Sequence, residues 1–231
     1  MTARVQGLTL ALCLALCAGR VPAAALSQVA IDVNGVREVV FRVPGDLSIE
    51  QAAFDELTIQ AEPAVLSKLN ARVRGERLHL EVRESLRTEH PIRLTLRLRE
   101  LAFLSNESSG NVRIDTLSQA TLRVKAVGSG DVVIAALRAD RLELLLSGSG
   151  DVSVRGTVLD VDVQHSGSGD FDGASLRAAS VQVLHEGSGD VSVGRVDRLD
   201  AVLQGSGDVR TVGTPRLLHV APGGTGELLA D

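Results

Sequence analysis

Apolar and polar residues alternate with a period of two through most of the C-terminal half of the chain. The alternation is clearest in the six positions before each of five Gly-Ser-Gly-Asp motifs, and it resumes after most of them. A period of two places successive side chains on opposite faces of a β-strand, so the pattern predicts strands with one face inward and one in water. The predicted inward set is Leu122, Val124, Ala126, Leu142, Leu144, Leu146, Val161, Val163, His165, Val181, Val183, His185, Leu199, Ala201 and Leu203.

The Gly-Ser-Gly-Asp motif, called the corner motif below, recurs at nearly constant spacing. First residues of successive motifs are 20, 19, 20 and 18 positions apart, and degenerate copies lie at 108–111 and 224–227. A fixed period of this size indicates one unit that is repeated and stacked, because a single unit cannot bury its apolar face alone. The full copies are Gly128-Ser129-Gly130-Asp131, Gly148-Ser149-Gly150-Asp151, Gly167-Ser168-Gly169-Asp170, Gly187-Ser188-Gly189-Asp190 and Gly205-Ser206-Gly207-Asp208.

These features predict an all-β chain that forms a right-handed parallel β-helix, or solenoid, with coils of about 18–20 residues. Each unit is expected to be a strand, a corner motif, a second strand and a looser corner near Leu117, Leu137, Leu176 or Val196. The right hand follows from the general preference of parallel crossover connections. We expect the regular solenoid to occupy residues 108–231.

Residues 26–107 are less regular but still rich in strand patterns. Short candidates lie at 39–43, 47–49, 57–59 and 78–82, and apolar residues alternate with polar ones over 92–99. We expect this part to form an N-terminal cap and irregular first β-coils.

Residues 1–25 have the pattern of a secretory signal peptide. Arg4 precedes an apolar stretch at 8–18, and small residues follow at 23–25. Export to the periplasm is therefore expected, with the outer surface or a lipid-anchored form as alternatives. Cys13 and Cys17 both lie in this segment, so the mature chain would have no cysteine for a disulfide, a thiolate metal site or a nucleophile.

Composition excludes some classes of partner. Removal of the signal would leave 22 basic and 29 acidic residues, and the chain has no Trp, no Tyr and four Phe. Such a chain has neither the basic groove nor the aromatic stacking platforms typical of nucleic-acid binding. We therefore expect no nucleic-acid partner.

The serial corner motifs, the Pro-Gly-Asp-Leu-Ser-Ile segment at 44–49 and the Gly-Thr-Pro at 213–215 together resemble the head GIN domain family. That family carries the label of an auto-transporter adhesin. The resemblance spans roughly residues 36–228, nearly all of the mature chain. It implies a right-handed β-helical fold and an exported location, and it brings no catalytic residues.

Two roles are open for the corner motifs. In a structural ladder, the glycines take φ > 0 or allow adjacent coils to approach closely, the serines hydrogen-bond to one another, and the aspartates accept backbone N–H groups. Alternatively, the aspartates bind calcium, as in glycine-aspartate β-rolls; the candidates are Asp131, Asp151, Asp170, Asp190 and Asp208. Those rolls have a nine-residue repeat, whereas this repeat is about twice as long. The structural ladder is the interpretation that we adopt.

His165 and His185 occupy the same position in successive coils, two residues before the corner motif. We expect them to stack inside the solenoid as neutral, packed side chains. The alternative is a zinc site in which Glu186 lies nearby, because paired histidines are common metal ligands. We expect no cofactor.

Leu145, Leu184 and Val202 fall at an outward position, three residues before the corner motif. They are either scattered surface residues or an apolar stripe for a partner or a second copy of the chain. The C-terminal end has no obvious cap, so its open edge strand would allow pairing between copies.

The function that these features favour is a non-enzymatic, exported solenoid that presents a rigid, adhesion-like surface to an unknown macromolecule of the cell envelope. The alternatives are an extracytoplasmic polysaccharide-active enzyme and a calcium-stabilised structural solenoid. The marked coils vary only between 18 and 20 residues, which leaves no long loop from which to build a catalytic cleft. We expect no transmembrane segment in the mature chain.

Overall fold

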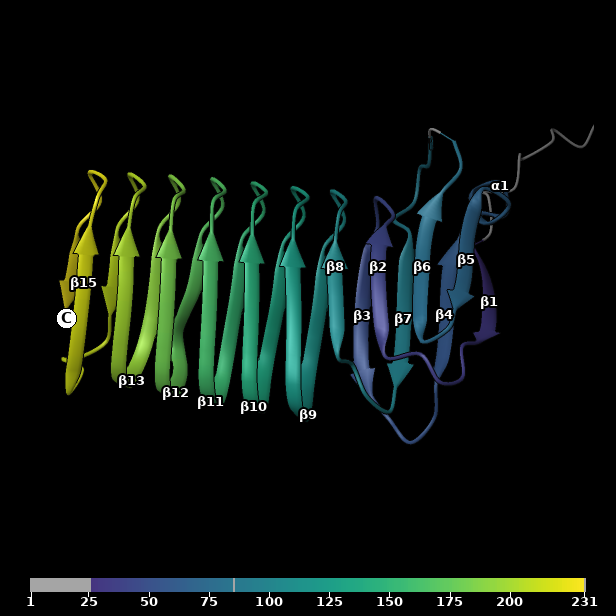
Figure 1. Cartoon of the computed structure of the whole chain (residues 1–231). Coiled ribbons are helices and arrows are strands. Elements are labelled where there is room, and N and C mark those ends of the chain that lie inside the picture. The colour runs from purple at the N-terminus through teal and green to yellow at the C-terminus, as the bar shows by residue number, and fades with distance from the viewer. Residues whose placement is uncertain (1–25, 85, 231) are drawn as a thin grey trace, which may run out of the picture.

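The chain folds as an all-β solenoid (Figure 1). The computed structural model describes residues 26–84 and 86–230, so the predicted signal peptide lies outside the described residues. Long strands pair in parallel with their neighbours, one coil beside the next, which confirms the prediction of a parallel β-solenoid. These strands are β9 (Val112–Ala126), β10 (Val132–Leu146), β11 (Val152–His165), β12 (Phe171–His185) and β13 (Val191–Leu203).

Each long strand turns through its coil without a break. β9 and β10 stay paired through the expected looser corner, where Leu117 and Leu137 lie side by side and are buried. This corner is therefore a bend within one continuous strand and not a loop between two strands, because backbone pairing continues around it. In Figure 1 the bends lie along the lower edge of the solenoid and the thin corner motifs along the upper edge.

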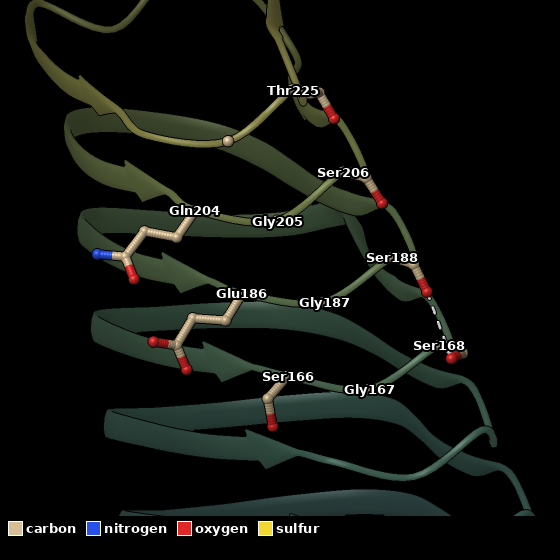
Figure 2. Close-up of a pocket in the computed structure, with 11 residues that line it drawn as sticks. Ser166, Gly167, Ser168, Glu186, Gly187, Ser188, Gln204, Gly205, Ser206 and Thr225 are labelled. Carbon is tan, nitrogen blue, oxygen red and sulfur yellow. Dashed lines mark hydrogen bonds between the residues drawn. The ribbon is translucent and has the colours of Figure 1, made fainter.

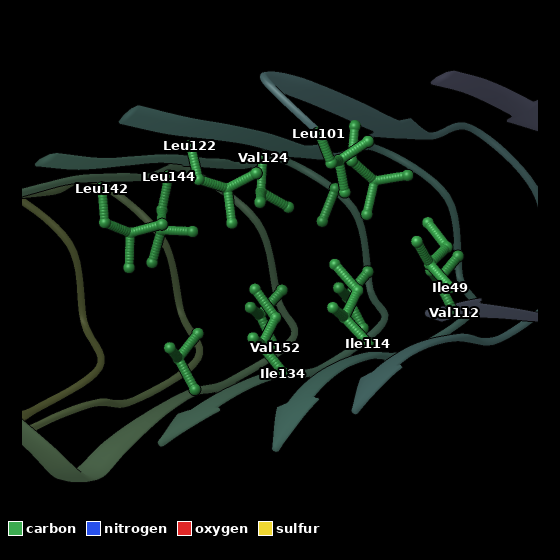
Figure 3. Close-up of a cluster of buried hydrophobic side chains, with 14 of the residues drawn as sticks. Ile49, Leu101, Val112, Ile114, Leu122, Val124, Ile134, Leu142, Leu144 and Val152 are labelled. Atoms are coloured by element: carbon green, nitrogen blue, oxygen red, sulfur yellow. The ribbon is translucent and has the colours of Figure 1, made fainter. Parts of the chain in front are cut away.

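The predicted inward residues form a continuous core, and all of them are buried. Residues at the same position of successive coils stack: Leu122 pairs in register with Leu142, and Val124 with Leu144. Figure 3 shows these columns facing a second set from the other half of each coil, which includes Ile114 and Ile134. Each buried aliphatic side chain contributes about 1.5–3 kcal/mol of transfer free energy, so the core grows with every coil that is added.

The N-terminal part combines parallel coils with antiparallel strands. β2 pairs in parallel with β6 and β8, and β3 pairs in parallel with β7 and β9. β1 and β7 flank β4 in antiparallel pairs, and β5 is antiparallel to β6. The elements are β1 (Ser27–Asp32), β2 (Glu38–Arg42), β3 (Asp46–Gln51), β4 (Glu56–Ala61), α1 (Pro63–Leu66), β5 (Leu69–Arg74), β6 (Arg77–Val82), β7 (Arg93–Leu98) and β8 (Phe103–Asn106).

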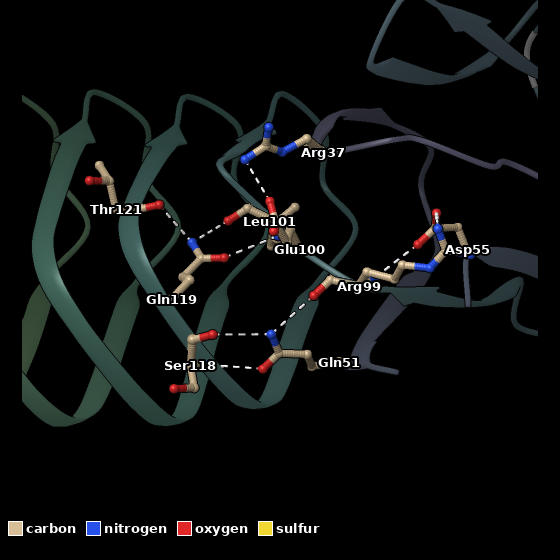
Figure 4. Close-up of polar contacts among 9 residues, drawn as sticks. All are labelled: Arg37, Gln51, Asp55, Arg99, Glu100, Leu101, Ser118, Gln119 and Thr121. Carbon is tan, nitrogen blue, oxygen red and sulfur yellow. Dashed lines mark hydrogen bonds and ion pairs between the residues drawn. The ribbon is translucent and has the colours of Figure 1, made fainter. Parts of the chain in front are cut away.

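Side-chain amides join this irregular part to the first regular coil (Figure 4). Gln51 Nε2 donates to the backbone carbonyls of Arg99 and Ser118, each at 3.1 Å, and Gln51 Oε1 accepts the Ser118 N–H at 2.9 Å. Gln119 makes a similar pair of bonds with the backbone of Leu101. These contacts satisfy backbone groups where the parallel ladder changes partners.

The strands of the C-terminal coil are shorter. β14 (Val209–Thr211) pairs with β13 and β16 (Leu228–Ala230), and β15 (Leu217–Pro222) pairs with β13. Leu218 continues the inward column of Leu199 but is 46% exposed, whereas Leu199 is fully buried. Within residues 26–84 and 86–230, no helix has the length and apolar character needed to cross a bilayer.

Neighbouring residues of β10 test the assignment of faces. Leu144 is 2% exposed and points inward, whereas Leu145 is half-buried on the outer face. Leu144→Ala should lower the free energy of unfolding by about 2–5 kcal/mol, and Leu145→Ala by about 1 kcal/mol or less. Urea denaturation of both variants measures the difference. Equal losses would contradict the inward and outward assignment.

Candidate functional site

Backbone hydrogen bonds hold each corner motif to the motif of the preceding coil. The N–H groups of Ser149 and Gly150 both donate to the carbonyl oxygen of Gly128, with N–O distances of 3.2 and 3.4 Å. A Cβ at position 148 would collide with that same oxygen, and a Cβ at position 150 would collide with the oxygen of Gly130. The corner glycines do not have positive φ angles. Of the two reasons that the sequence offered for glycine, close approach of the coils is the one that applies.

The aspartates form a hydrogen-bonded ladder along the outside of the corners. The N–H of Asp151 donates to Oδ1 of Asp131 at 3.0 Å, and the same bond recurs from coil to coil with distances of 2.7–3.0 Å. Asn111 accepts the first N–H of the series, from Asp131, and Glu227 donates the last, to Asp208. Each carboxylate therefore fixes the backbone of the next coil. The N–H groups so bound belong to Asp131, Asp151, Asp170, Asp190, Asp208 and Glu227.

The hydrogen bond from the Asp208 N–H lowers the pKa of Asp190 below its usual value, and the guanidinium of Arg210 adds to this effect. Arg210 Nη1 lies 2.8 Å from Asp190 Oδ2. The carboxylate form of Asp190 is therefore favoured in the folded chain.

The corner serines do not form the continuous side-chain ladder that the sequence suggested. Among the corner serines, which the structure describes in full, one hydrogen bond joins two side chains, from Ser188 Oγ to Ser168 Oγ at 3.3 Å. Ser129, Ser149 and Ser206 are exposed like this pair. Their backbone N–H groups already bond to the preceding coil, which leaves the hydroxyls facing water.

The calcium interpretation gains no support from the arrangement of the aspartates. Each Oδ1 atom from Asp131 to Asp208 already accepts a backbone N–H. Across the part of the chain that the structure describes, no three His, Cys, Asp or Glu side chains gather closely enough to hold a metal ion. The ladder acts as a set of anionic hydrogen-bond acceptors for the backbone.

His165 and His185 stack inside the corner and are 1% and 0% exposed. Their ring centroids are 4.9 Å apart, and their Nδ1 atoms are separated by 2.9 Å. Nε2 of His165 lies 2.6 Å from the oxygen of Gly169, and Nε2 of His185 lies 2.9 Å from that of Gly207. All four ring nitrogens thus take part in hydrogen bonds, which leaves none to ligate zinc. Burial lowers the pKa of His185, and the nearby His165 adds to this effect.

Asn106 is buried like the two histidines, and we did not identify it from the sequence. It lies two residues before the degenerate motif at 108–111, the position that the histidines take in later coils. Its Nδ2 donates to the oxygens of Gly110 and Gly130, at 2.9 and 3.1 Å. The common position relative to the motif was a signal that could have identified it.

An exposed surface on the outer side of the corners is the candidate binding site. A shallow, open hollow of about 440 Å³ crosses four successive corners, and Figure 2 shows its hydroxyl groups in a row. Two residues before Ser166, Glu186 and Gln204 of the hollow, the strands carry Gln164, Leu184 and Val202 in register, and Leu145 extends this row onto β10. We call this surface the corner ledge; it comprises that row together with Ser166, Gly167, Ser168, Glu186, Gly187, Ser188, Gln204, Gly205, Ser206, Gly224 and Thr225.

The corner ledge offers mixed chemistry on a rigid base. Leu145, Leu184 and Val202 are half-buried, so each presents part of an apolar side chain next to exposed polar groups. Glu186 and Gln204 are exposed and lie on the strand side of the row of hydroxyl groups (Figure 2). Such a surface can bind an extended or flat partner through alternating apolar and hydrogen-bonding contacts.

A model of the family described as "Putative auto-transporter adhesin, head GIN domain" matches residues 37–215. The chain belongs to this family. No curated protein matches the sequence of this head GIN domain.

Solved structures share the fold of this head GIN domain. A protein described as a putative adhesin from Bacteroides fragilis has a TM-score of 0.86 at 22% identity, covering 91% of this chain and 99% of that chain. A protein described as a putative lipid binding protein from Parabacteroides distasonis has a TM-score of 0.69 at 20% identity, covering 88% and 96%. A protein described as a putative adhesin from Parabacteroides merdae has a TM-score of 0.66 at 17% identity, covering 88% and 95%. At these identities the likeness extends to the fold alone.

Gly148→Ala tests the close approach at the corners. The added Cβ would collide with a backbone oxygen of the preceding coil, so the coils must separate. We expect a loss of about 1–3 kcal/mol or more in the free energy of unfolding. Ser149→Ala, one residue away and exposed, should change it by less than about 0.5 kcal/mol. Chemical denaturation followed by circular dichroism measures both changes. An unchanged free energy of unfolding for Gly148→Ala would overturn the role assigned to this glycine.

Asp190→Asn tests the charge of the ladder while keeping an oxygen that can accept the Asp208 N–H, as Asn111 does naturally for Asp131. Because the pKa of Asp190 is lowered in the folded chain, its contribution should be present above about pH 4 and lost as the pH falls through the folded pKa. The wild type should therefore be more stable than the variant at neutral pH, and the gap should narrow as the pH falls below about 4. Melting temperatures of both proteins across this range provide the measurement. A gap that does not depend on pH would show that the charge contributes nothing.

Proposed function

We propose that this head GIN domain is an exported, non-enzymatic binding module that uses the corner ledge to hold another macromolecule of the cell envelope. The observation that carries the proposal is the continuity of the ledge. Leu184 and Val202 lie in register on adjacent coils, with Gln164 between them and Leu145, and the polar hollow crosses four successive corners. The adhesin description of the family supports a location outside the cytoplasm.

Rigidity supports a binding role. Leu184 and Val202 lie on the adjacent strands β12 and β13, which are paired without interruption over the six residues that lead to each corner motif. Backbone hydrogen bonds and the aspartate ladder fix the two corner motifs that follow. A surface that is already ordered loses little conformational entropy when a partner binds. Binding energy from many weak contacts can then accumulate along the solenoid axis.

A partner that fits this surface is neutral or positively charged where it faces the corner motifs. Asp131, Asp151 and Asp170 line that edge, and Glu186 lies on the ledge itself. A strongly anionic partner such as a nucleic acid would be repelled. The half-buried aliphatic row favours a partner with its own apolar side chains or methyl groups.

The coil architecture supports binding over catalysis. The corners that line the hollow have nearly equal lengths, so the hollow is shallow and open and lacks walls of projecting loops. Catalytic sites usually occupy deeper clefts, where water is excluded and the pKa values of paired acids are shifted. A polysaccharide-active enzyme of this fold would need such a cleft.

The proposal is tested by photo-crosslinking in intact cells. A photoreactive amino acid at position 188 on the ledge should capture a discrete partner, whereas the same group at Ser192, on the outer face of the other half of the coil, should not. Leu184→Lys, which places a charge in the apolar row, should reduce capture at least tenfold. Gln182→Lys adds the same charge two residues away on the same strand and should leave capture unchanged.

Both lysine variants must retain the wild-type melting temperature, so that lost capture reports the surface and not the fold. Identical products from positions 188 and 192, or full capture by Leu184→Lys, would overturn the assignment of the ledge. Protease treatment of intact cells separates surface display from a periplasmic location.

A further inference from the structure

The buried pair His165 and His185 has more hydrogen bonds than two neutral rings can supply with protons. One short contact joins the two Nδ1 atoms at 2.9 Å. Two more run from the Nε2 atoms to the carbonyl oxygens of Gly169 and Gly207. A carbonyl oxygen only accepts, so both Nε2 atoms must carry a proton.

A neutral imidazole has a single N–H. With both of these protons on Nε2, the two Nδ1 atoms would face each other as bare lone pairs at hydrogen-bond distance, which is repulsive. A third proton between the Nδ1 atoms turns this repulsion into a hydrogen bond. The alternative, moving one proton from Nε2 to Nδ1, would instead set a bare nitrogen against a carbonyl oxygen in a buried site, and this also costs free energy.

We propose that His165 and His185 form a buried proton-binding site that holds one proton between their Nδ1 atoms, as an imidazole–imidazolium pair with a single positive charge. From the sequence we expected two neutral rings. The geometry assigns them one shared charge, which locks the corners at Gly169 and Gly207 to the core.

The surroundings of the pair suit one positive charge. Asp170, Asp190 and Asp208 lie in the corner motifs next to the rings, and the charges of Asp190 and Asp208 favour the protonated form of His185. Glu186 follows His185 and is exposed, and Arg210 is engaged with Asp190 and Asp208. On the strands at either side, the residues in register with the pair are Leu146 and Leu203, which carry no charge.

A second proton is excluded by the same surroundings. Burial penalises charge, and two imidazolium rings with Nδ1 atoms 2.9 Å apart would repel each other. Both effects act to lower the pKa of His185. Binding of a second proton by the pair is therefore much less favourable than binding of the first.

The proton count predicts a distinctive dependence of stability on pH. In the unfolded chain each histidine titrates near pH 6.5. Well above that pH the unfolded chain carries no proton on these rings while the folded pair carries one, so stability falls as the pH rises toward the folded pKa. Well below it the unfolded chain carries two and the folded pair one, so stability falls as the pH drops. The contribution of the pair is greatest near pH 6.5.

The test compares the wild type with the double variant His165→Leu/His185→Leu, because leucine occupies this position in β10 and β13. Subtracting one profile of unfolding free energy against pH from the other removes the contribution of every other titrating group. The relative unfolding constant of the wild type should rise up to about tenfold per pH unit above about pH 7.5, and about tenfold per unit on descending below about pH 5.5. A neutral pair would give no change at the high end and about a hundredfold per unit at the low end, which would overturn the proposal.

Nitrogen-15 NMR of the folded wild type supplies a readout that does not depend on folding of the variant. At neutral pH, a slowly exchanging N–H signal coupled to one or both Nδ1 atoms, together with protonated Nε2 atoms on both rings, is expected. Two neutral rings, seen as a non-protonated Nε2 on either ring, would overturn the proposal.

Discussion

Backbone hydrogen bonding between coils, at a strand spacing of about 4.8 Å, is the constraint on which the rest of this molecule depends. Along the flat parts of each coil this spacing is easily kept, because side chains alternate between core and water. At the tight corners the carbonyl of one coil occupies the place where the next coil would put a Cβ, as Gly128 does for Gly148. Glycine at both positions of every full corner motif is the consequence.

The polar residues of the corners follow from the same constraint. A tight corner leaves amide and carbonyl groups that the ladder of strands does not satisfy, and these need other partners. Aspartate supplies acceptors from the outside, as Asp131 does for Asp151. Asn106, His165 and His185 supply donors from the inside. Across the residues that the structure describes, no buried side-chain nitrogen or oxygen lacks a hydrogen-bond partner.

Much of this fold could be predicted from the sequence because each repeat carries its own alternation of apolar and polar residues and its own corner motif. The two-residue alternation assigned Leu142, Leu144 and Leu146 to the core correctly, and the corner spacing gave the stacking. The continuous strand through Leu117 and Leu137 could not be distinguished from two strands, because a smooth bend requires no glycine or proline.

The candidate site was only partly accessible from the sequence. The apolar row of Leu145, Leu184 and Val202 was found by its position, but the hollow beside it depends on how four corners stack. The N-terminal pairings were also beyond the pattern, since β4 and β7 join in an antiparallel sense that alternation does not specify. The proton on the histidine pair depends on ring orientation, which spacing along the chain does not encode.

The bends differ from the corners in how they tolerate changes of chain length. The corner motif has four residues in every full copy. The register of strand pairing, by contrast, shifts at three places: between Ile134 and Leu137, between Ser153 and Gly156, and between Gly173 and Arg177. All three shifts lie at the bend. Insertions or deletions of one or two residues are thus absorbed on the edge opposite the corner motifs. Loops or inserted segments can therefore be accommodated at the bends, while the corner motifs keep their register.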